Sequence, residues 1–467
     1  MSELLTSSAF ALAGRIRRRE LSSLELVDAH IAQIERVNPV LNAVVRDRFA
    51  EARVEARRAD AGLARGEALA PLHGVPCTIK EAFALTGMPN TSGLLARKGF
   101  LATCDAPAVA KLRAAGAIPL GVTNVSELCM WLESNNRVYG RSNNPYDPAR
   151  TVGGSSGGEG AIVGAAASPF GLGSDVGGSI RLPAFFNGVF GHKPSSGWID
   201  NGGQFPRATG VADRYLTTGP LCRRAMDLAP LLRILGPERE LPEPGSVALR
   251  GLDVVSVTSG LTRVSPELLD AQARVERALE ERGARVRRES IPLLERGMEI
   301  WSAMMAEAGG PSFAELLGEG HAIPVAWQLL KLALGRSAHT LPALGLAALE
   351  KLPRLLPARS ESSLRLGDEL RRELTARIGT GVMLYPTYPM TAPRHHQPLL
   401  PPIHWGYTAV INVMELPATQ VPLGLDAKGL PLGLQVVAAH GADHVSLAVA
   451  LALEEAFGGW VPPARWT

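Results

Sequence analysis

Residues 151–161, with the sequence TVGGSSGGEGA, constrain this chain most, because four glycines and two serines fill six consecutive positions. The glycines continue directly into the run AIVGAAA, which contains only small or apolar residues. A helix of such residues suits close packing in a protein interior, whereas a flexible linker separates blocks of different composition. The stretch therefore indicates a tight turn before a core helix, with two hydroxyl groups held in that turn.

Two other kinds of functional site, a nucleophile elbow and a phosphate-binding loop, have sequence motifs similar to this stretch. Gly153, Ser155 and Gly157 fit the G-x-S-x-G pattern of a nucleophile elbow, and histidines that could complete such a triad follow. An elbow expects a strand directly before its serine, but the preceding NNPYDPAR predicts a broken loop, which disfavours this alternative. Phosphate binding is disfavoured too, because no Gly-Lys-Ser/Thr follows the glycines and no G-x-G-x-x-G opens a helix.

A second serine lies in a comparable setting. The segment GLGSDVGGSIRLPA places Ser179 after two glycines, and such a turn exposes successive backbone N–H groups that can surround a developing oxyanion. Upstream, Lys80 ends the apolar run in PLHGVPCTIKEAF. A lysine buried there would lose its proton readily, because desolvation disfavours the charged form. Alone it would indicate only a surface charge, so its prediction as a base depends on the two serine segments.

Short apolar runs alternate with helical patterns from end to end, which predicts an α/β layered protein. Ser22 and Glu25 form a capping box that begins a helix ending at Asn38-Pro39, and Asp443 caps a closing helix over 445–457. Further helices are predicted at 47–65 and 108–115, and strands at 78–79, 118–122, 251–257, 382–385 and 433–437. No repeat or low-complexity linker divides the chain.

The bulk composition excludes several classes of protein. A net charge of only +3 in 467 residues argues against a dedicated nucleic-acid binder. The four cysteines lie far apart without a CxxC pair, which argues against a zinc site or disulfide framework and fits a reducing cytoplasm. No secretory signal is recognisable and no uninterrupted apolar run reaches about 18 residues. We therefore expect a cytoplasmic protein that is at most peripheral to a membrane.

One segment, residues 322–359, departs from the alternating pattern. It is rich in leucine, carries five basic residues against one acid, and contains four prolines that divide it into short helices. The basic residues are Lys331, Arg336, Lys351, Arg354 and Arg359. Two interpretations stay open: an apolar lid or membrane-touching cap that admits an apolar substrate, and a helical insertion packed on the core.

Taken together, the lysine and the two serine segments resemble the amidase signature family. The family pattern is a lysine after a G-V-P turn, then G-G-S-S-G-G, then G-S/T-D-x-G-G-S-I-R, and all three occur in this order and at fitting spacing. Similar segments include TNVSEL, TTGPLCR, ELPATQVPLG and GLPLGLQVVA, so the resemblance covers nearly the whole chain. It implies a single amidase signature domain over 1–467, with its catalytic core at 60–235 and a central mixed β-sheet covered by helices.

Within the family, KEAF, GGSSGGEGA and FNGVFGHKPS resemble the fatty acid amide hydrolase branch, and its second type in particular. Many relatives have Lys-Asp where this chain has Lys80-Glu81, and Leu-Lys-Pro where it has His192-Lys193-Pro194. These differences favour the hydrolase branch over the glutamine-amidotransferase subunit.

The resemblance implies a catalytic Ser-Ser-Lys triad. Ser179 would be the nucleophile, and Ser155, after a cis peptide bond from Gly154, would relay its proton to neutral Lys80. The implied oxyanion hole consists of the backbone N–H groups of Val176, Gly177, Gly178 and Ser179. The residues expected to brace these loops are Ser156, Asp175 and Arg181.

Six side chains are candidates for the wall of an acyl pocket, although ordinary core packing explains each of them equally well. They are Cys129, Met130, Trp131, Trp301, Met304 and Trp327. No metal is expected, because no carboxylate or cysteine falls at ligand spacing from His395, His396 and His404. No cofactor is expected either.

The resulting hypothesis is a serine amidase that cleaves hydrophobic acyl amides of the fatty acid amide or N-acyl amine type. Its partners would be a small-molecule amide with an apolar acyl group and no nucleic acid, while a peripheral membrane contact and a homodimer stay open. The alternatives are a glutamine-amidotransferase-type subunit of a transamidation complex, and an aryl or short-chain amidase or esterase of the same family. A catalytically inactive lipid-surface binding protein is the alternative from another class.

Overall fold

An 11-stranded sheet runs through the centre of the computed structural model, which describes residues 2–237, 240–350 and 357–466. Its strands are β1 (Val44–Asp47), β2 (Pro76–Lys80), β3 (Ile118–Thr123), β6 (Phe170–Asp175), β7 (Phe190–Lys193), β8 (Thr217–Cys222), β9 (Asp253–Ser256), β10 (Arg285–Arg288), β11 (Val382–Tyr385), β12 (Ala418–Leu425) and β13 (Pro431–Ala438). They lie in the order β1-β3-β2-β6-β8-β7-β12-β13-β11-β9-β10. Two short strands, β4 (Asn135–Asn136) and β5 (Gly140–Arg141), pair separately.

The sheet is mixed. Strand β2 is parallel to β3 and β6, and β9 is parallel to β10 and β11, whereas the strands between these groups pair antiparallel. Most central strands are buried along their whole length, as expected for a sheet covered on both faces. The predicted α/β fold with a mixed sheet covered by helices is confirmed.

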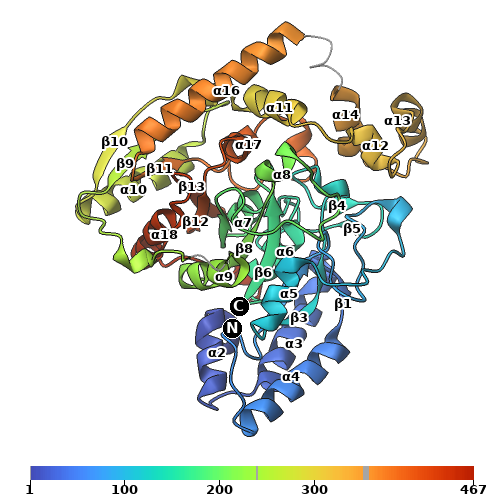
Figure 1. The fold of residues 1–467 in the computed structure, drawn as a ribbon, viewed down its shortest axis with the longest axis vertical. Helices are drawn as coiled ribbons and strands as arrows, with labels where there is room; N and C mark the ends of the chain where they lie inside the picture. The colour runs from blue at the N-terminus through green and yellow to red at the C-terminus, as the bar shows by residue number, and fades with distance from the viewer. Residues whose placement is uncertain (1, 238–239, 351–356, 467) are drawn as a thin grey trace.

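Helices enclose this sheet on both faces (Figure 1). They are α1 (Glu3–Thr6), α2 (Ala9–Arg17), α3 (Ser23–Leu41), α4 (Phe49–Ala64), α5 (Pro107–Ala114), α6 (Gly157–Gly164), α7 (Arg181–Phe186), α8 (Val211–Tyr215), α9 (Leu228–Leu235), α10 (Pro266–Glu281), α11 (Gly297–Glu307), α12 (Phe313–Leu317), α13 (Val325–Ala333), α14 (Leu341–Leu349), α16 (Pro357–Ile378), α17 (Gly406–Val413) and α18 (Asp443–Phe457). Helices α5, α9, α18 and α10 form one continuous layer, while α6 and α7 pack on the sheet with α3 beside them.

The strand order positions the candidate site. Strands β2 and β6 are parallel neighbours, with Thr78 opposite Gly171 and Ile79 opposite Leu172. Their carboxyl ends therefore meet at one edge of the sheet. Lys80 is the last residue of β2, and Asp175 is the last residue of β6. Helix α6 packs on both strands, and the serine turn that precedes it reaches the same edge.

Two predicted helix ends differ from the structure. The capping box of Ser22 and Glu25 is confirmed, but α3 continues through Pro39 to Leu41, because a proline in the last turn removes only one backbone hydrogen bond. At the start of α18 the predicted cap is wrong. Asp443 lies inside the helix, and its carboxylate accepts hydrogen bonds from the Ser195 N–H at 2.8 Å and the His192 ring at 3.1 Å instead.

Several central strands lack a recognisable strand pattern, and β6, β8 and β12 were not predicted. Because these strands are buried on both faces, their sequences FGLGSD, TTGPLC and ATQVPLGL show no alternation of apolar and polar residues. Gly171 shows why glycine is needed there, since a Cβ at this position would overlap the carboxylate of Glu159.

The predicted insertion at 322–359 does contain short helices, α13 and α14, followed by the start of α16. Lys351, Pro353 and Arg354 lie outside the described residues. Part of the segment packs on the body of the protein, since Ala343, Leu344 and Ala347 form a small core with Leu128 and Leu317. Among the described helices, none is both long and apolar enough to cross a bilayer.

Candidate active site

The amino group of Lys80 lies at the centre of the site and is completely buried. It donates hydrogen bonds to the Ser155 hydroxyl at 2.6 Å and to the Ser174 hydroxyl at 3.0 Å. Burial is the main cause that lowers the pKa of Lys80 below its ordinary value, and it outweighs the opposite effects of Cys129 and Asp175. A neutral amine in contact with two hydroxyl groups can accept a proton from either of them.

A buried carboxyl on α6, that of Glu159, does little to keep Lys80 protonated. Glu159 accepts hydrogen bonds from Thr78 at 2.6 Å and Thr123 at 2.8 Å, so its oxygens are directed to hydroxyl groups. Burial raises the pKa of this carboxyl to about 8, which makes the neutral acid its main form at pH 7. Burial therefore favours the uncharged form of both the lysine and the acid inside the sheet.

Close packing explains why the turn before α6 consists of glycine and serine. A Cβ on Gly154 would overlap the backbone of Trp131 and Glu133, and one on Gly158 would overlap the backbone of Asn124. The peptide bond between Gly154 and Ser155 is cis, as the resemblance implied. The Ser155 hydroxyl therefore reaches Lys80 from a backbone that has no room for larger residues.

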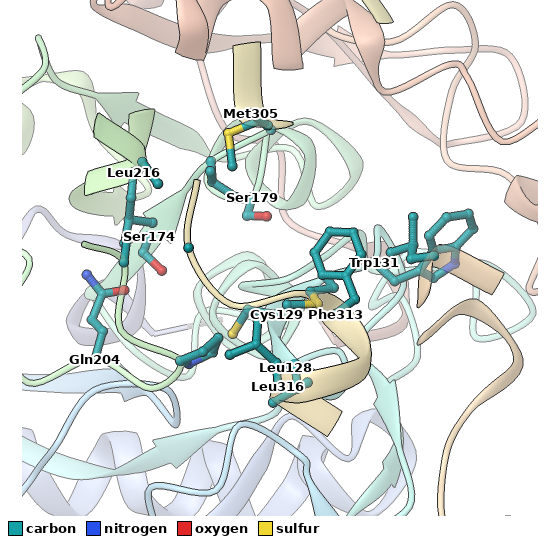
Figure 2. Close-up of a pocket in the computed structure, with 18 of the residues that line it drawn as sticks. Leu128, Cys129, Trp131, Ser174, Ser179, Gln204, Leu216, Met305, Phe313 and Leu316 are labelled. Atoms are coloured by element: carbon teal, nitrogen blue, oxygen red, sulfur yellow. The ribbon is translucent and has the colours of Figure 1, made fainter. Parts of the chain in front are cut away.

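The two serine segments meet directly. The Ser156 N–H donates to the Ser179 carbonyl at 3.2 Å, and the Ser156 hydroxyl bonds to the Ser174 carbonyl at 3.3 Å. Ser179 itself is partly exposed, and Figure 2 shows its hydroxyl directed into the pocket. The structure shows the contact from Lys80 to Ser155, but no side-chain hydrogen bond from Ser155 to Ser179 among the described residues.

A buried ion pair holds the turn that carries Ser179. Arg181 donates to both carboxylate oxygens of Asp175, at 3.0 and 2.9 Å, and neither side chain is exposed. Although burial alone would raise it, the pKa of Asp175 stays below its ordinary value because of the Arg181 charge and hydrogen bonds. Breaking such a buried pair costs about 3–5 kcal/mol, so the turn is rigid.

Three of the four predicted oxyanion donors are free to bind a substrate. The N–H groups of Val176, Gly177 and Ser179 have no hydrogen-bond acceptor among the described residues. The prediction for Gly178 is wrong in this geometry, since its N–H donates to Asp175 at 2.7 Å.

Side chains from distant segments donate hydrogen bonds to two carbonyl groups of the same turn. The Trp301 indole donates to the Val176 carbonyl at 3.0 Å, and the Thr408 hydroxyl donates to the Gly177 carbonyl at 2.7 Å. Trp301 also packs edge-on against Trp405, with the ring centroids 4.6 Å apart. The first contact fixes the peptide group that carries the free N–H of Gly177, and the second fixes the peptide group of Gly178, whose N–H is bound to Asp175.

A largely apolar pocket opens beside Ser179 and encloses about 1220 Å³ of space, including solvent at its mouth. Cys129, Met130, Trp131 and Trp301 line it, as predicted. Its other large apolar side chains include Leu132, Leu182, Phe205, Leu346 and Trp405, and those of Leu128, Leu216, Met305, Phe313 and Leu316, which Figure 2 labels. The pocket therefore presents a mainly apolar wall directly beside the Ser179 hydroxyl.

Two of the predicted pocket residues are placed elsewhere. Met304 is buried but faces Gly367 of α16, while its neighbour Met305 lines the pocket, because one step along a helix rotates a side chain by about 100°. Trp327 lies on the outer surface of α13 and is 52% exposed. Among the residues the structure describes, no group of three possible ligands lies close enough to bind a metal ion together.

Sequence reasoning missed three features of the site. The Ser174 hydroxyl contacts Lys80, and its only signal was its place in the GLGSD segment. Thr408 and Trp405 reach the site from α17 and the residue before it, more than 200 residues after the serine segments, and no local motif marks them. Helix α12 forms part of the pocket wall although it precedes the predicted insertion.

Comparison of this chain with known protein families, sequences and structures agrees with this geometry. Residues 25–447 match the protein family described as Amidase. The chain is 49% identical to "Fatty-acid amide hydrolase 2-A" of Danio rerio and 46% identical to "Fatty-acid amide hydrolase 2" of Homo sapiens, in both cases over 99% of this chain and 91% of the relative. Among solved structures, 6-aminohexanoate cyclic dimer hydrolase superposes with a TM-score of 0.80 at 28% identity, with all of both chains covered.

The buried lysine predicts how the reactivity of the site depends on pH. A fluorophosphonate reagent should label the chain faster as the pH rises, because only the neutral amine of Lys80 can accept a proton. Since burial lowers the pKa of Lys80, the midpoint of this rise should lie below the ordinary lysine pKa of 10.5. In Lys80→Arg, with circular dichroism confirming the fold, labelling should stay slow at every pH. A wild-type rise centred at or above 10.5 would contradict this assignment.

Proposed function

Because this chain belongs to the amidase signature family, we propose that it hydrolyses the amide bond of fatty acid amides, with Ser179 as the nucleophile. The observation that supports this most is the fully buried amine of Lys80. It lies 2.6 Å from the hydroxyl of Ser155, and the turn that carries Ser155 contacts the segment that carries Ser179. The mainly apolar lining of the pocket at Ser179 suits the acyl chain of such a substrate. The relatives that are 46–49% identical are named fatty-acid amide hydrolases, which agrees with this substrate class.

In the proposed mechanism the proton moves along the three side chains. Neutral Lys80 takes the proton of Ser155, and Ser155 takes that of Ser179 as the Ser179 oxygen attacks the amide carbonyl carbon. The relay then runs in reverse and gives the proton to the substrate nitrogen. The carbon–nitrogen bond breaks, the amine leaves, and the acyl group stays bonded to Ser179. Water activated by the same relay then releases the fatty acid.

The negative charge on the carbonyl oxygen would be stabilised by the free backbone N–H groups of Val176, Gly177 and Ser179. One critical donor of this kind contributes about 3–4 kcal/mol to the transition state. The Asp175–Arg181 ion pair and the Trp301 hydrogen bond support this role, because they hold the donors in place before the charge develops. Residues 60–235 thus contain the relay and these N–H groups.

The helices α13 and α14 would serve as a cap that contacts a lipid surface. Five large apolar side chains on or between them are about half exposed: Trp327, Leu330, Leu334, Leu341 and Leu349. Lys331 lies beside the Trp327 ring at 5.8 Å, so a positive charge accompanies the apolar surface. Leu346 of α14 lines the pocket, which puts the cap next to the place where the acyl chain binds.

Hydrolysis of oleamide by the purified chain, without any partner, tests the proposed function directly. We expect steady release of oleic acid, and we expect Ser179→Ala to reduce it about 10⁴-fold or more, since the nucleophile is removed. The exposed Ser246→Ala is the matched control and should retain wild-type activity. Oleamide hydrolysis or fluorophosphonate labelling that persists in Ser179→Ala would exclude this nucleophile.

Binding to vesicles tests the cap. Replacing Trp327 and Leu334 together by serine should weaken cosedimentation with phosphatidylcholine–phosphatidylglycerol vesicles about tenfold, since two apolar anchors are lost. Val54 and Met226 are exposed apolar residues on other parts of the surface, and their double replacement by serine is the control. Equal vesicle binding by the wild type and both double variants would rule out this surface as the membrane contact.

A further inference from the structure

A buried carboxylate links the cap, helices α13 and α14, to the wall of the pocket. Glu127 lies in a short helical turn, Glu127–Cys129, and is 2% exposed. Its two oxygens accept hydrogen bonds from the His339 ring nitrogen Nδ1 at 2.8 Å and from the Thr340 N–H at 2.7 Å. His339 and Thr340 are buried too, and they directly precede α14. This contact therefore joins two segments that lie more than 200 residues apart in the sequence.

On one side of this contact, the chain continues directly into the pocket wall. Residues 128–131 follow Glu127, and all four line the pocket. Leu128 and Cys129 have φ angles of 54° and 59°, a conformation that residues other than glycine rarely adopt. Such a backbone persists only where its surroundings hold it. The Glu127 contacts provide this support, together with the hydrogen bond from the Leu128 N–H to the Ser92 carbonyl at 2.7 Å.

On the other side of the contact, two helices contribute apolar side chains to the same pocket. Leu346 comes from α14, and Phe313 and Leu316 come from α12, against which α14 packs. Figure 2 shows Leu316 beside Leu128, and both belong to an apolar cluster that joins α12 and α14. The buried contact therefore helps to determine how close α12 and α14 lie to the wall that contains Leu128.

The other connections of these helices to the rest of the protein hold them less firmly. Arg97 lies 3.8 Å from Glu319, whose side chain is 43% exposed, and such a long pair open to water contributes little. Gly309 and Gly310 connect α11 to α12 with φ angles of 72° and 107°, and they have open space where a Cβ would lie. Glycine leaves this connection free to bend. The position of α12 and α14 over the pocket therefore depends strongly on Glu127.

We propose that Glu127 and His339 determine the selectivity of the pocket for long acyl chains, as positioning residues that hold α12 and α14 against residues 128–131. This inference rests on the proposed amidase function and concerns the acyl part of its substrate. A short acyl chain occupies only the space next to Ser179. A long chain buries further methylene groups against the two helices, and each of them adds binding free energy. Loosening the helices therefore weakens the binding of long chains and leaves short chains unaffected.

The test compares p-nitrophenyl laurate with p-nitrophenyl butyrate, which share a leaving group and differ only in acyl length. Release of p-nitrophenolate by the purified full chain, below micelle formation, gives kcat/KM for each ester. We expect Glu127→Gln to lower the laurate-to-butyrate ratio about three- to tenfold, mainly through KM for laurate, because the amide leaves one of the two donors without an acceptor. Glu281→Gln changes an exposed carboxylate at the end of α10, and this matched control should keep the wild-type ratio.

Substitutions of His339 test the same contact from the other side. His339→Asn retains an N–H group near the place of the ring Nδ1 and should keep most of the ratio, whereas His339→Leu should lower it as Glu127→Gln does. In the double variant Glu127→Gln/His339→Leu, the loss should be smaller than the product of the two single losses, since both substitutions remove one contact. A loss equal to that product would show that the two residues act separately and would overturn the proposal.

Two further readouts separate this role from a general loss of structure. In Glu127→Gln, a short-chain fluorophosphonate should label Ser179 at the wild-type rate, and hydrogen exchange should become faster in α12 and α14 but not in α18. An unchanged laurate-to-butyrate ratio, or slower labelling with equal losses for both esters, would overturn the role of Glu127 and leave the amidase function intact. Absence of oleamide hydrolysis by the wild type would overturn the proposed function, while the ester ratio would still test Glu127. Absence of hydrolysis of all three substrates would overturn both.

Discussion

The burial of one amino group, that of Lys80, determines much of this structure. Lys80 ends a central strand, and its hydrogen-bond partners are the Ser155 and Ser174 hydroxyls rather than an ionised carboxylate. The neutral amine is therefore favoured, and an amine in that state is a base. The requirement for hydroxyl groups this close explains the serine turn, and the shortage of space around the turn explains its glycines. The catalytic hypothesis follows from these packing constraints.

Rigidity around Ser179 comes from a second buried interaction. The Asp175–Arg181 ion pair holds both ends of the Ser179 turn, while Trp301 and Thr408 bind two of its carbonyl groups. The free N–H groups that remain are thus oriented by contacts with segments far away in the sequence. The same segments line the pocket, so the shape of the substrate site and the orientation of the reactive backbone depend on each other.

The chemistry of the site was easier to predict from sequence than its surroundings. Lys80, Ser155, Ser179 and Asp175 lie in short motifs that resemble the amidase signature, and their expected roles came from this resemblance. Residues that contact the site from distant segments carry no such sequence signal, and Thr408 was missed for this reason. Asp443 was predicted to cap its own helix, whereas its carboxylate binds His192 and Ser195. The prediction that Met304 lines the pocket was wrong. The packing of α11 against α16 turns Met304 toward α16 and its neighbour Met305 toward the pocket. Strands buried on both faces, such as β6, were not predicted because their sequences show no alternation of apolar and polar residues.

The ionisation of Lys80 in the resting protein tests the central claim most directly. The chain contains seven lysines, so the protein labelled with ¹³C at the lysine ε-carbon should give few NMR resonances, and Lys80→Met identifies the one from Lys80. We predict that this resonance titrates below the ordinary lysine pKa of 10.5, since burial lowers the pKa of Lys80. A titration in which the Lys80 amino group stays protonated up to or beyond pH 10.5 would contradict the account.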